Sequence, residues 1–371
     1  MGWSICGAQV SSQMLRRGAS VGDDIVSRNQ NRKVSRRSSG RPTIADVAKL
    51  AGVAAITVSR ALRDPSLVSA ELRAQIDTAV VQLGYAPDPN ARALASSRAD
   101  VIGVLVPSLT NIVFADTVRG IYDELGESPL QILMGNTHYS PCEEERLVRM
   151  FLSQRPSALI VSGIDQTDTT RKLLETAGCP VVQIMEIGED PVDMLVGFSH
   201  FEGGKTATNH LLEAGYRRIG FIGARMDPRS QRRLAGYRWA MEEARLFDPK
   251  LVTTTLTPSS MPLGGQLLAD ALAKAHDLDA VFCNNDDLAM GVLFECQRAA
   301  IAVPQRMGIC GFNDLDMMRV AHPPLTSVRT PRYDIGRRSV QMVRDRLADR
   351  AVSPAVVDLG FELQIRESTM R

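Results

Sequence analysis

The feature that most constrains the fold is an alternation of short apolar runs with amphipathic stretches between residues 99 and 371. We predict buried parallel strands at 101–106, 131–134, 158–161, 181–185, 219–222 and 280–283. Parallel strands covered on both faces read as continuous apolar runs and need helical crossovers. The pattern therefore predicts a doubly wound α/β core, long enough for two lobes.

The segment 42–86 has a different, helical pattern. Thr43 and Asp46 have the spacing of a capping box, Gly52 permits a tight turn, and a second helix over 54–62 precedes Pro65. A third helix is predicted from Ser69 to Gly84. This arrangement indicates a small all-α helix-turn-helix domain, whose second helix enters the major groove of DNA. A plain three-helix packing unit is the alternative.

The outward side chains of the second helix suit a duplex. Arg60 has the fork that bonds guanine O6 and N7, and Ala55 and Ile56 offer apolar contact, for example to a thymine methyl. Hydroxyls suited to phosphate oxygens, which position the protein without specifying sequence, belong to Thr43, Thr57 and Ser59.

Charge and composition restrict the remaining possibilities. Residues 1–41 carry eight basic and two acidic side chains in a chain whose net charge is only +1, so we interpret them as a disordered basic tail. Alternatively, the tail results from a start codon assigned too far upstream. The tail lacks the apolar core of a secretory signal, which argues against secretion. There is no apolar run of 18 residues, and the six cysteines are scattered. We expect a cytoplasmic protein with reduced thiols and no membrane segment.

Polar side chains that follow the predicted strands are the candidate binding residues, because ligands of such sheets bind at the carboxyl ends of strands. They are Ser108, Asn111, Phe114, Glu186, Arg225, Arg229, Arg233, Asn285, Asp286, Asn313 and Asp314. Acids, amides and arginine forks together suit a polyhydroxylated, anionic small molecule. A solvated loop or a helix cap is the alternative for each residue taken alone.

Three motifs of other chemistries are incomplete. The GGKT at 203–206 lacks the first glycine of a phosphate-binding loop, because Ser199 stands there. No GxGxxG follows the first strand, and His200 and Glu202 have no cysteine pair nearby. No nucleophile–base pair stands out, so we expect no metal, no cofactor and no enzyme activity.

Residues 43–62, the segment GYAPDPNARALASSR and the strand VIGVLVPSLTN resemble the LacI/GalR family of bacterial repressors. The resemblance covers about 42–371 and implies two lobes of the periplasmic-binding-protein type over 99–371. It also implies a hinge helix within 87–98 that forms on operator DNA, with Asn90 at its start and Leu94 as a wedge in the minor groove. The chain departs from the family at Ala54, where Ser or Thr is usual, so a helix cap and a phosphate contact are in doubt.

The resemblance also implies roles in the effector lobes. Arg233, before LAG, matches the arginine that contacts effector hydroxyls or carboxylate, and Glu186, Phe114 and Asn285 match other effector positions. Asn313 stands where the family usually has an aspartate that bonds an effector hydroxyl. The neighbouring Asp314 is a candidate for that role.

The segments VLVPSLTNIVFADTVRGI, VGFSHFEGG and VFCNNDDLAMGVLFECQR look like the branch of gluconate-operon repressors. We therefore expect a repressor that binds operator DNA and is released by a sugar acid of the gluconate or 2-ketogluconate class. Without a long C-terminal heptad, a homodimer is favoured over a tetramer. The alternatives are a periplasmic-type sugar-binding protein and a sugar-acid enzyme.

Overall fold

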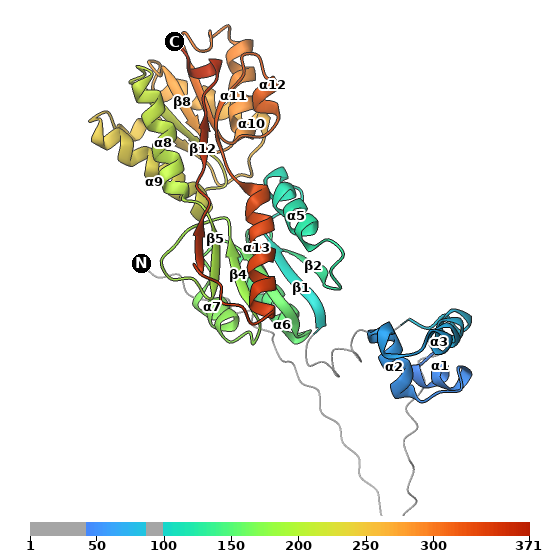
Figure 1. Ribbon diagram of the computed structural model, residues 1–371. Coiled ribbons are helices and arrows are strands. Elements are labelled where there is room, and N and C mark those ends of the chain that lie inside the picture. The colour runs from blue at the N-terminus through green and yellow to red at the C-terminus, as the bar shows by residue number, and fades with distance from the viewer. Residues whose placement is uncertain (1–41, 87–98) are drawn as a thin grey trace, which may run out of the picture. The chain divides into compact units, whose positions relative to one another are not determined.

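The computed structural model describes residues 42–86 and 99–371, and the chain divides into two compact units on either side of residue 86 (Figure 1). The predictions for the tail 1–41, for the hinge 87–98 and for its residues Asn90 and Leu94 lie outside the described residues.

The first unit contains three helices around a small apolar core. They are α1 (Ile44–Leu50), α2 (Ala55–Arg63) and α3 (Ala70–Leu83), with a 3-10 turn at Pro65–Leu67. The capping box of Thr43 and Asp46 is present, and Gly84 ends α3 with a φ of 58°. Ala54 precedes α2 without a side-chain cap, as the departure from the family pattern implies. Buried Val47, Val58 and Ile76 come one from each helix, so packing of all three helices forms this core.

The second unit contains two lobes, each built on a six-stranded sheet. The sheet of the first lobe is wholly parallel. Its strands, in sheet order, are β11 (Val356–Asp358), β5 (Met194–Gly197), β4 (Val181–Ile184), β3 (Pro156–Ser162), β1 (Ala99–Val106) and β2 (Gln131–Asn136). Helices α5 (Ile112–Leu125) and α13 (Arg332–Leu347) cover one face, and α6 (Pro141–Ser153) and α7 (Asp168–Glu175) cover the other.

The sheet of the second lobe is parallel except at one edge, where β12 runs antiparallel to β10. Its strands, in order, are β12 (Glu362–Gln364), β10 (Thr326–Arg329), β9 (Gly308–Asn313), β8 (Ala280–Cys283), β6 (Ile219–Gly223) and β7 (Val252–Thr254). Its helices are α8 (His200–Glu213), α9 (Pro228–Glu243), α10 (Met261–Lys274), α11 (Asp286–Arg298) and the short α12 (Met317–Val320). Short 3-10 turns occur at Pro249–Leu251 and Glu367–Thr369.

The chain passes between the lobes three times. It leaves the first lobe after β5 and enters α8, returns from β10 into α13, and leaves again from β11 into β12 (Figure 1). Each lobe therefore contains segments from distant parts of the sequence. This topology agrees with the predicted doubly wound, two-lobed core.

Neighbouring helices approach closely at pairs of glycines. A β-carbon at any of these glycines would overlap backbone atoms of the partner helix. The pairs are Gly204 and Gly236 between α8 and α9, Gly264 and Gly291 between α10 and α11, and Gly120 and Gly336 between α5 and α13. The contact between α8 and α9 places the start of α8 against the backbone of Arg233.

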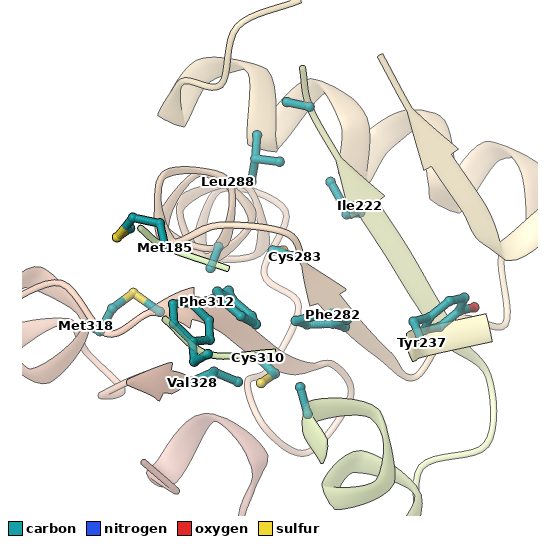
Figure 2. Close-up of a cluster of buried hydrophobic side chains, with 14 of the residues drawn as sticks. Met185, Ile222, Tyr237, Phe282, Cys283, Leu288, Cys310, Phe312, Met318 and Val328 are labelled. Atoms are coloured by element: carbon teal, nitrogen blue, oxygen red, sulfur yellow. The ribbon is translucent and has the colours of Figure 1, made fainter. Parts of the chain in front are cut away.

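The core of the second lobe is rich in aromatic side chains. Figure 2 shows Phe282 and Phe312 next to each other on adjacent strands, and their ring centroids are 6.4 Å apart. Cys283 and Cys310 are buried in the same cluster, and burial raises the pKa of both thiols. The cysteines in the described ranges are all free. Among the helices of those ranges, none is both long and apolar enough to cross a bilayer.

Candidate functional site

The carboxyl ends of strands from both sheets border one cavity between the lobes. The cavity holds about 590 Å³ of space not filled by protein atoms, part of it open to solvent. Loops after β1, β2 and β4 contribute from the first lobe, and loops after β6, β8 and β9 contribute from the second. This is the position at which doubly wound sheets bind ligands.

Seven of the predicted effector residues line this cavity: Asn111, Phe114, Arg225, Arg229, Arg233, Asn285 and Asn313. Asp286, which also follows a predicted strand, lines it too. Asn111 caps α5 by accepting from the Val113 amide, and Asn285 caps α11 by accepting from the Leu288 amide. The strand ends therefore present helix-capping amides to the cavity.

Three predicted residues have other partners and lie outside the cavity lining. Ser108 accepts the Asn111 amide at 3.1 Å, Glu186 pairs with Arg232 at 3.3 Å, and Asp314 pairs with Arg366 at 2.7 Å. Asp314 also pairs with Arg329. Each of the two acids is thus paired with an arginine that is not part of the cavity lining.

Arg233 on α9 is a buried charged group without a direct ion pair among the described residues, although the charges of Asp227, Glu186 and Asp286 favour its cationic form. Its residue is 8% exposed, and its guanidinium lies 3.8 Å from the centroid of the Phe312 ring. Nε donates to His200 Nδ1 at 3.1 Å, and Nη1 donates to the Asn284 carbonyl. Burial lowers its pKa to about 10, so the group is still cationic at neutral pH. Within 42–86 and 99–371, no carboxylate forms an ion pair with it.

The other two predicted arginines are arranged differently. Arg229, one turn before Arg233 on α9, pairs with Asp227 at 3.5 Å and lies 5.4 Å from the Phe114 ring centroid. Arg225 precedes α9, so it does not share that helical face, and it stacks on Tyr139 at 4.0 Å. The regular spacing of 225, 229 and 233 in the sequence is therefore not one helical stripe.

Acidic and hydroxyl groups complete the polar wall. Asp286 is fully buried, and its oxygens accept from the Leu315 amide at 2.7 Å and the Ser327 hydroxyl at 2.7 Å. Burial raises the pKa of Asp286 to about 6. Asp287 lies 3.4 Å from the Ser259 hydroxyl, and burial raises its pKa as well.

Sequence reasoning missed several lining residues. Tyr139 follows β2 at a φ of 58°, Met185 follows β4 at a φ of 73°, and His200 begins α8. Asp227 caps α9, and Ser259 lies in the loop before α10. Their position after strand ends was the available signal, whereas His200 in the sequence is weighed above only as a zinc ligand. In the described ranges, no group of acidic, histidine or cysteine side chains has the arrangement of a metal site.

The predicted DNA-contacting residues lie on the first unit. Ala55, Ile56, Ser59 and Arg60 are exposed on α2, and Thr57 is half-buried. Thr43 is exposed but uses its hydroxyl in the capping box with Asp46. The exposed face of α2 therefore carries the cation of Arg60 and an apolar side chain, Ile56, that is 62% exposed.

Two protein-family models match the chain. The one described as bacterial regulatory proteins of the lacI family matches residues 43–88, and the one described as a periplasmic binding protein-like domain matches 208–369. The HTH-type transcriptional regulator GntR of Pseudomonas aeruginosa is 42% identical over 333 residues, which are 90% of this chain and 97% of that protein. GntR of Escherichia coli K12 is 38% identical over 87% of this chain and 97% of its own length.

A solved structure supports the same assignment. A LacI-family transcriptional regulator from Silicibacter pomeroyi superposes with a TM-score of 0.83 at 33% identity, covering 89% of this chain and all of that one. With the helix-turn-helix unit, the two-lobed core and relatives matched along nearly their whole length, the chain belongs to the LacI family of bacterial transcriptional regulators, in the gluconate-repressor branch.

Proposed function

We propose that this regulator controls sugar-acid genes by binding a gluconate-type effector, gluconate or 2-ketogluconate, in the cavity between its lobes. The effector carboxylate pairs with Arg233, and its hydroxyls bind Asn111, Asn285 and Asn313. Phe114, Arg225 and Arg229 complete the wall. Ser108, Glu186 and Asp314 support this site from outside the lining.

Each segment within the predicted boundaries has its own function. Residues 42–86 bind operator DNA, 87–98 form the hinge with Asn90 and Leu94, and 99–371 bind effector and a second copy of the chain. A homodimer is the working form, with a tetramer as the larger alternative, and the cytoplasm is where such a regulator meets DNA. The cavity binds its ligand without turning it over.

The observation that carries the proposal is the buried charge of Arg233. A buried cation without a direct ion pair is costly even with the carboxylates of Asp227, Glu186 and Asp286 nearby, and a planar carboxylate supplies both charge and paired hydrogen-bond acceptors. Because two hydrogen bonds and the Phe312 ring fix the guanidinium, an anion meets a preorganised partner. A neutral sugar would leave this charge unpaired.

Release from DNA then follows as a population shift. An effector that contacts both lobes favours one lobe angle over another, and linkage requires that it lower operator affinity if the operator favours the other angle. The three crossings are the segments that change when the lobes rotate.

Calorimetric titration of the full chain tests the proposal, using gluconate and 2-ketogluconate with glucose as the neutral comparison. We expect both acids to bind and glucose to bind far more weakly. Arg233→Ala should cost about 2–5 kcal/mol of effector affinity. Arg233→Lys should also weaken binding, because an ammonium lacks the planar fork. Arg238→Ala, on the same helix but paired with Glu242 at the surface, is the matched control.

All variants should still bind operator. Glucose binding as tightly as gluconate, or unchanged gluconate affinity in Arg233→Ala, would contradict the carboxylate role. A turnover assay of gluconate with ATP or NAD tests the enzyme alternative, and any product formation would contradict a binding-only role.

A further inference from the structure

His200 occupies a buried position where the chain enters the second lobe. It is the first residue of α8, three residues after the end of β5, and it is 1% exposed. Its ring packs against those of Phe198 and Phe312, at centroid distances of 4.4 and 5.7 Å. A polar ring held among aromatic side chains needs partners for both nitrogens.

The partners of the two nitrogens fix the tautomer. Arg233 Nε–H can only donate, so His200 Nδ1, 3.1 Å away, must accept and carries no proton. The proton therefore lies on Nε2, which donates to the Met185 carbonyl at 2.9 Å. Burial and the nearby charges of Arg233 and Arg229 lower the pKa of His200 well below its usual value, which favours the same neutral form.

These two bonds join the lobes. Met185 follows β4 of the first lobe, and Arg233 belongs to α9 of the second. The Met185 amide also donates to Val196 of β5, so its backbone is held on both sides in a left-handed conformation. Met185, His200 and Arg233 all line the cavity. One ring therefore connects Arg233 to the backbone of the other lobe by two hydrogen bonds.

We propose that His200 is a positioning residue, which aims the Arg233 guanidinium into the cavity and ties it to the first lobe through Met185. The inference rests on the proposed function in that Arg233 receives the effector. With Nε and one Nη1 hydrogen already bonded, the remaining hydrogens of the fork are free to face a ligand. The tie to Met185 makes the lobe angle depend on what Arg233 binds.

Two substitutions of His200 distinguish its bond with Arg233 from its bond with Met185. His200→Asn places an amide oxygen near the position of Nδ1 and keeps the acceptor for Arg233, but it cannot reach Met185. His200→Leu removes both bonds. His210→Leu is the matched control, because His210 lies on the same helix and bonds Thr369 away from the cavity.

We expect His200→Leu to weaken gluconate binding at least tenfold in calorimetry. His200→Asn should bind gluconate with an affinity within threefold of that of the wild type. The factor by which saturating gluconate lowers its operator affinity should, however, be at least threefold smaller than in the wild type. His210→Leu should behave as the wild type in both assays. Unchanged gluconate affinity in His200→Leu, or equal losses in the Leu and Asn variants, would overturn the positioning role. An unchanged release in His200→Asn would overturn the tie to Met185.

A measurement on the ligand-free wild type separates this inference from the identity of the effector. With ¹⁵N-labelled histidine, NMR should show His200 with an unprotonated Nδ1 and a protonated Nε2, and His200→Asn assigns the signals. A cationic or Nδ1-protonated His200 would overturn the inference. If gluconate fails to bind the wild type while the tautomer is as expected, the proposed effector is wrong but the bond from Arg233 to His200 stands.

Discussion

At the scale of the residue, the partner of each arginine on α9 decides what that arginine can do. Arg238 pairs with Glu242 at the surface, Arg232 pairs with two acids of the other lobe, and Arg229 pairs with Asp227. Arg233 alone of these four has only neutral partners. Four arginines on one helix thus differ in their partners, which are a surface acid, acids of the other lobe, the acid that caps the helix and, for Arg233, neutral groups.

His200 makes stability depend on pH in a calculable direction. Its pKa is lowered in the folded protein, so below about 6.5 the unfolded chain takes up a proton that the folded chain does not. The free energy of unfolding should therefore fall with pH below about 6.5, by at most about 1.4 kcal/mol per pH unit for one proton. Denaturant unfolding of wild type and His200→Asn between pH 7.5 and 5.5 checks this.

The difference between the two proteins isolates His200. Asp286 acts in the opposite direction, because its pKa is raised in the folded protein. It stabilises the fold fully at pH values below its pKa in the unfolded chain, and this stabilisation is lost as the pH rises through about 6. His210 acts in the same direction as His200. Both are present in each protein, so parallel pH curves for the two proteins would contradict the neutral, buried His200.

Arg60 is the residue of α2 that we expect to read a base. Arg60→Ala should cost about 1–3 kcal/mol on an operator selected from a random duplex library, and leave binding to random duplex nearly unchanged. Arg73→Ala removes the same charge from α3 and controls for general attraction to phosphates. A gel-shift titration measures both, and equal losses on operator and random duplex would assign Arg60 to a phosphate.

At the scale of the element, helix packing depends on glycines whose neighbours leave no room for a side chain. Gly264 and Gly265 are adjacent in α10, yet a β-carbon at Gly264 would overlap the Leu288 backbone, whereas one at Gly265 would lie 3.4 Å from Glu295. Close approach of α10 to α11 is what sets the Asn285 end of α11 beside the cavity.

We expect Gly264→Ala to lower the free energy of unfolding by about 1–3 kcal/mol, because the helices must separate. Gly265→Ala should be neutral or stabilising by up to about 1 kcal/mol, since alanine has the higher helix propensity. Urea unfolding of the two variants under the same conditions makes the comparison. Equal effects would mean that the contact between α10 and α11 is not tight.

Elements were predictable from the sequence where a strand is an apolar run, including β2 at the edge of its sheet. The six predicted strands all form, because continuous apolar runs mark strands covered on both faces. The missed strands include β10 and β12, whose sequences TSVR and ELQ are short and polar. They also include the fully buried β5 and β9, MLVG and GICGFN, whose apolar runs are short or interrupted by glycine. Their pairing depends on partners far away in the chain, which a local pattern does not contain.

The same limit applies to the site. Positions after strand ends indicated most of the cavity wall, but which arginine lacks an acid depends on side chains from other elements. Glu186 follows β4 as the pattern requires, yet its carboxylate forms an ion pair with Arg232. His200 begins a helix, and only the contact of α8 with α9 brings its ring to Arg233.

At the scale of the whole molecule, an ion pair bridges the lobes near the cavity. Arg232 of α9 donates to both oxygens of Asp165, after β3 of the first lobe, at 2.8 and 2.6 Å. Arg229 also reaches Ser162 of the first lobe at 3.3 Å. These contacts exist in the arrangement of the lobes described here, so they stabilise it relative to any arrangement in which the lobes are further apart.

Asp165→Asn should shift the lobes toward a more open arrangement. Because both side chains are about one-third exposed, we expect a modest effect, a two- to fivefold loss of effector affinity, or roughly 1 kcal/mol or less. Small-angle scattering of the ligand-free protein should show a larger radius of gyration. Asp190→Asn, which breaks a pair with Arg171 inside one lobe, is the control. Identical scattering and affinity in both variants would rule out a role for this bridge.

The order in which strands join the sheets has a consequence for synthesis. The edge strand β11 of the first lobe and the edge strand β12 of the second both come from residues 356–364, and α13, which covers the first sheet, is formed by residues 332–347. While the ribosome is still making these segments, neither lobe has its full complement of strands, although residues 42–86 have long since emerged. A nascent chain therefore presents its helix-turn-helix segment before the cavity between the lobes can exist.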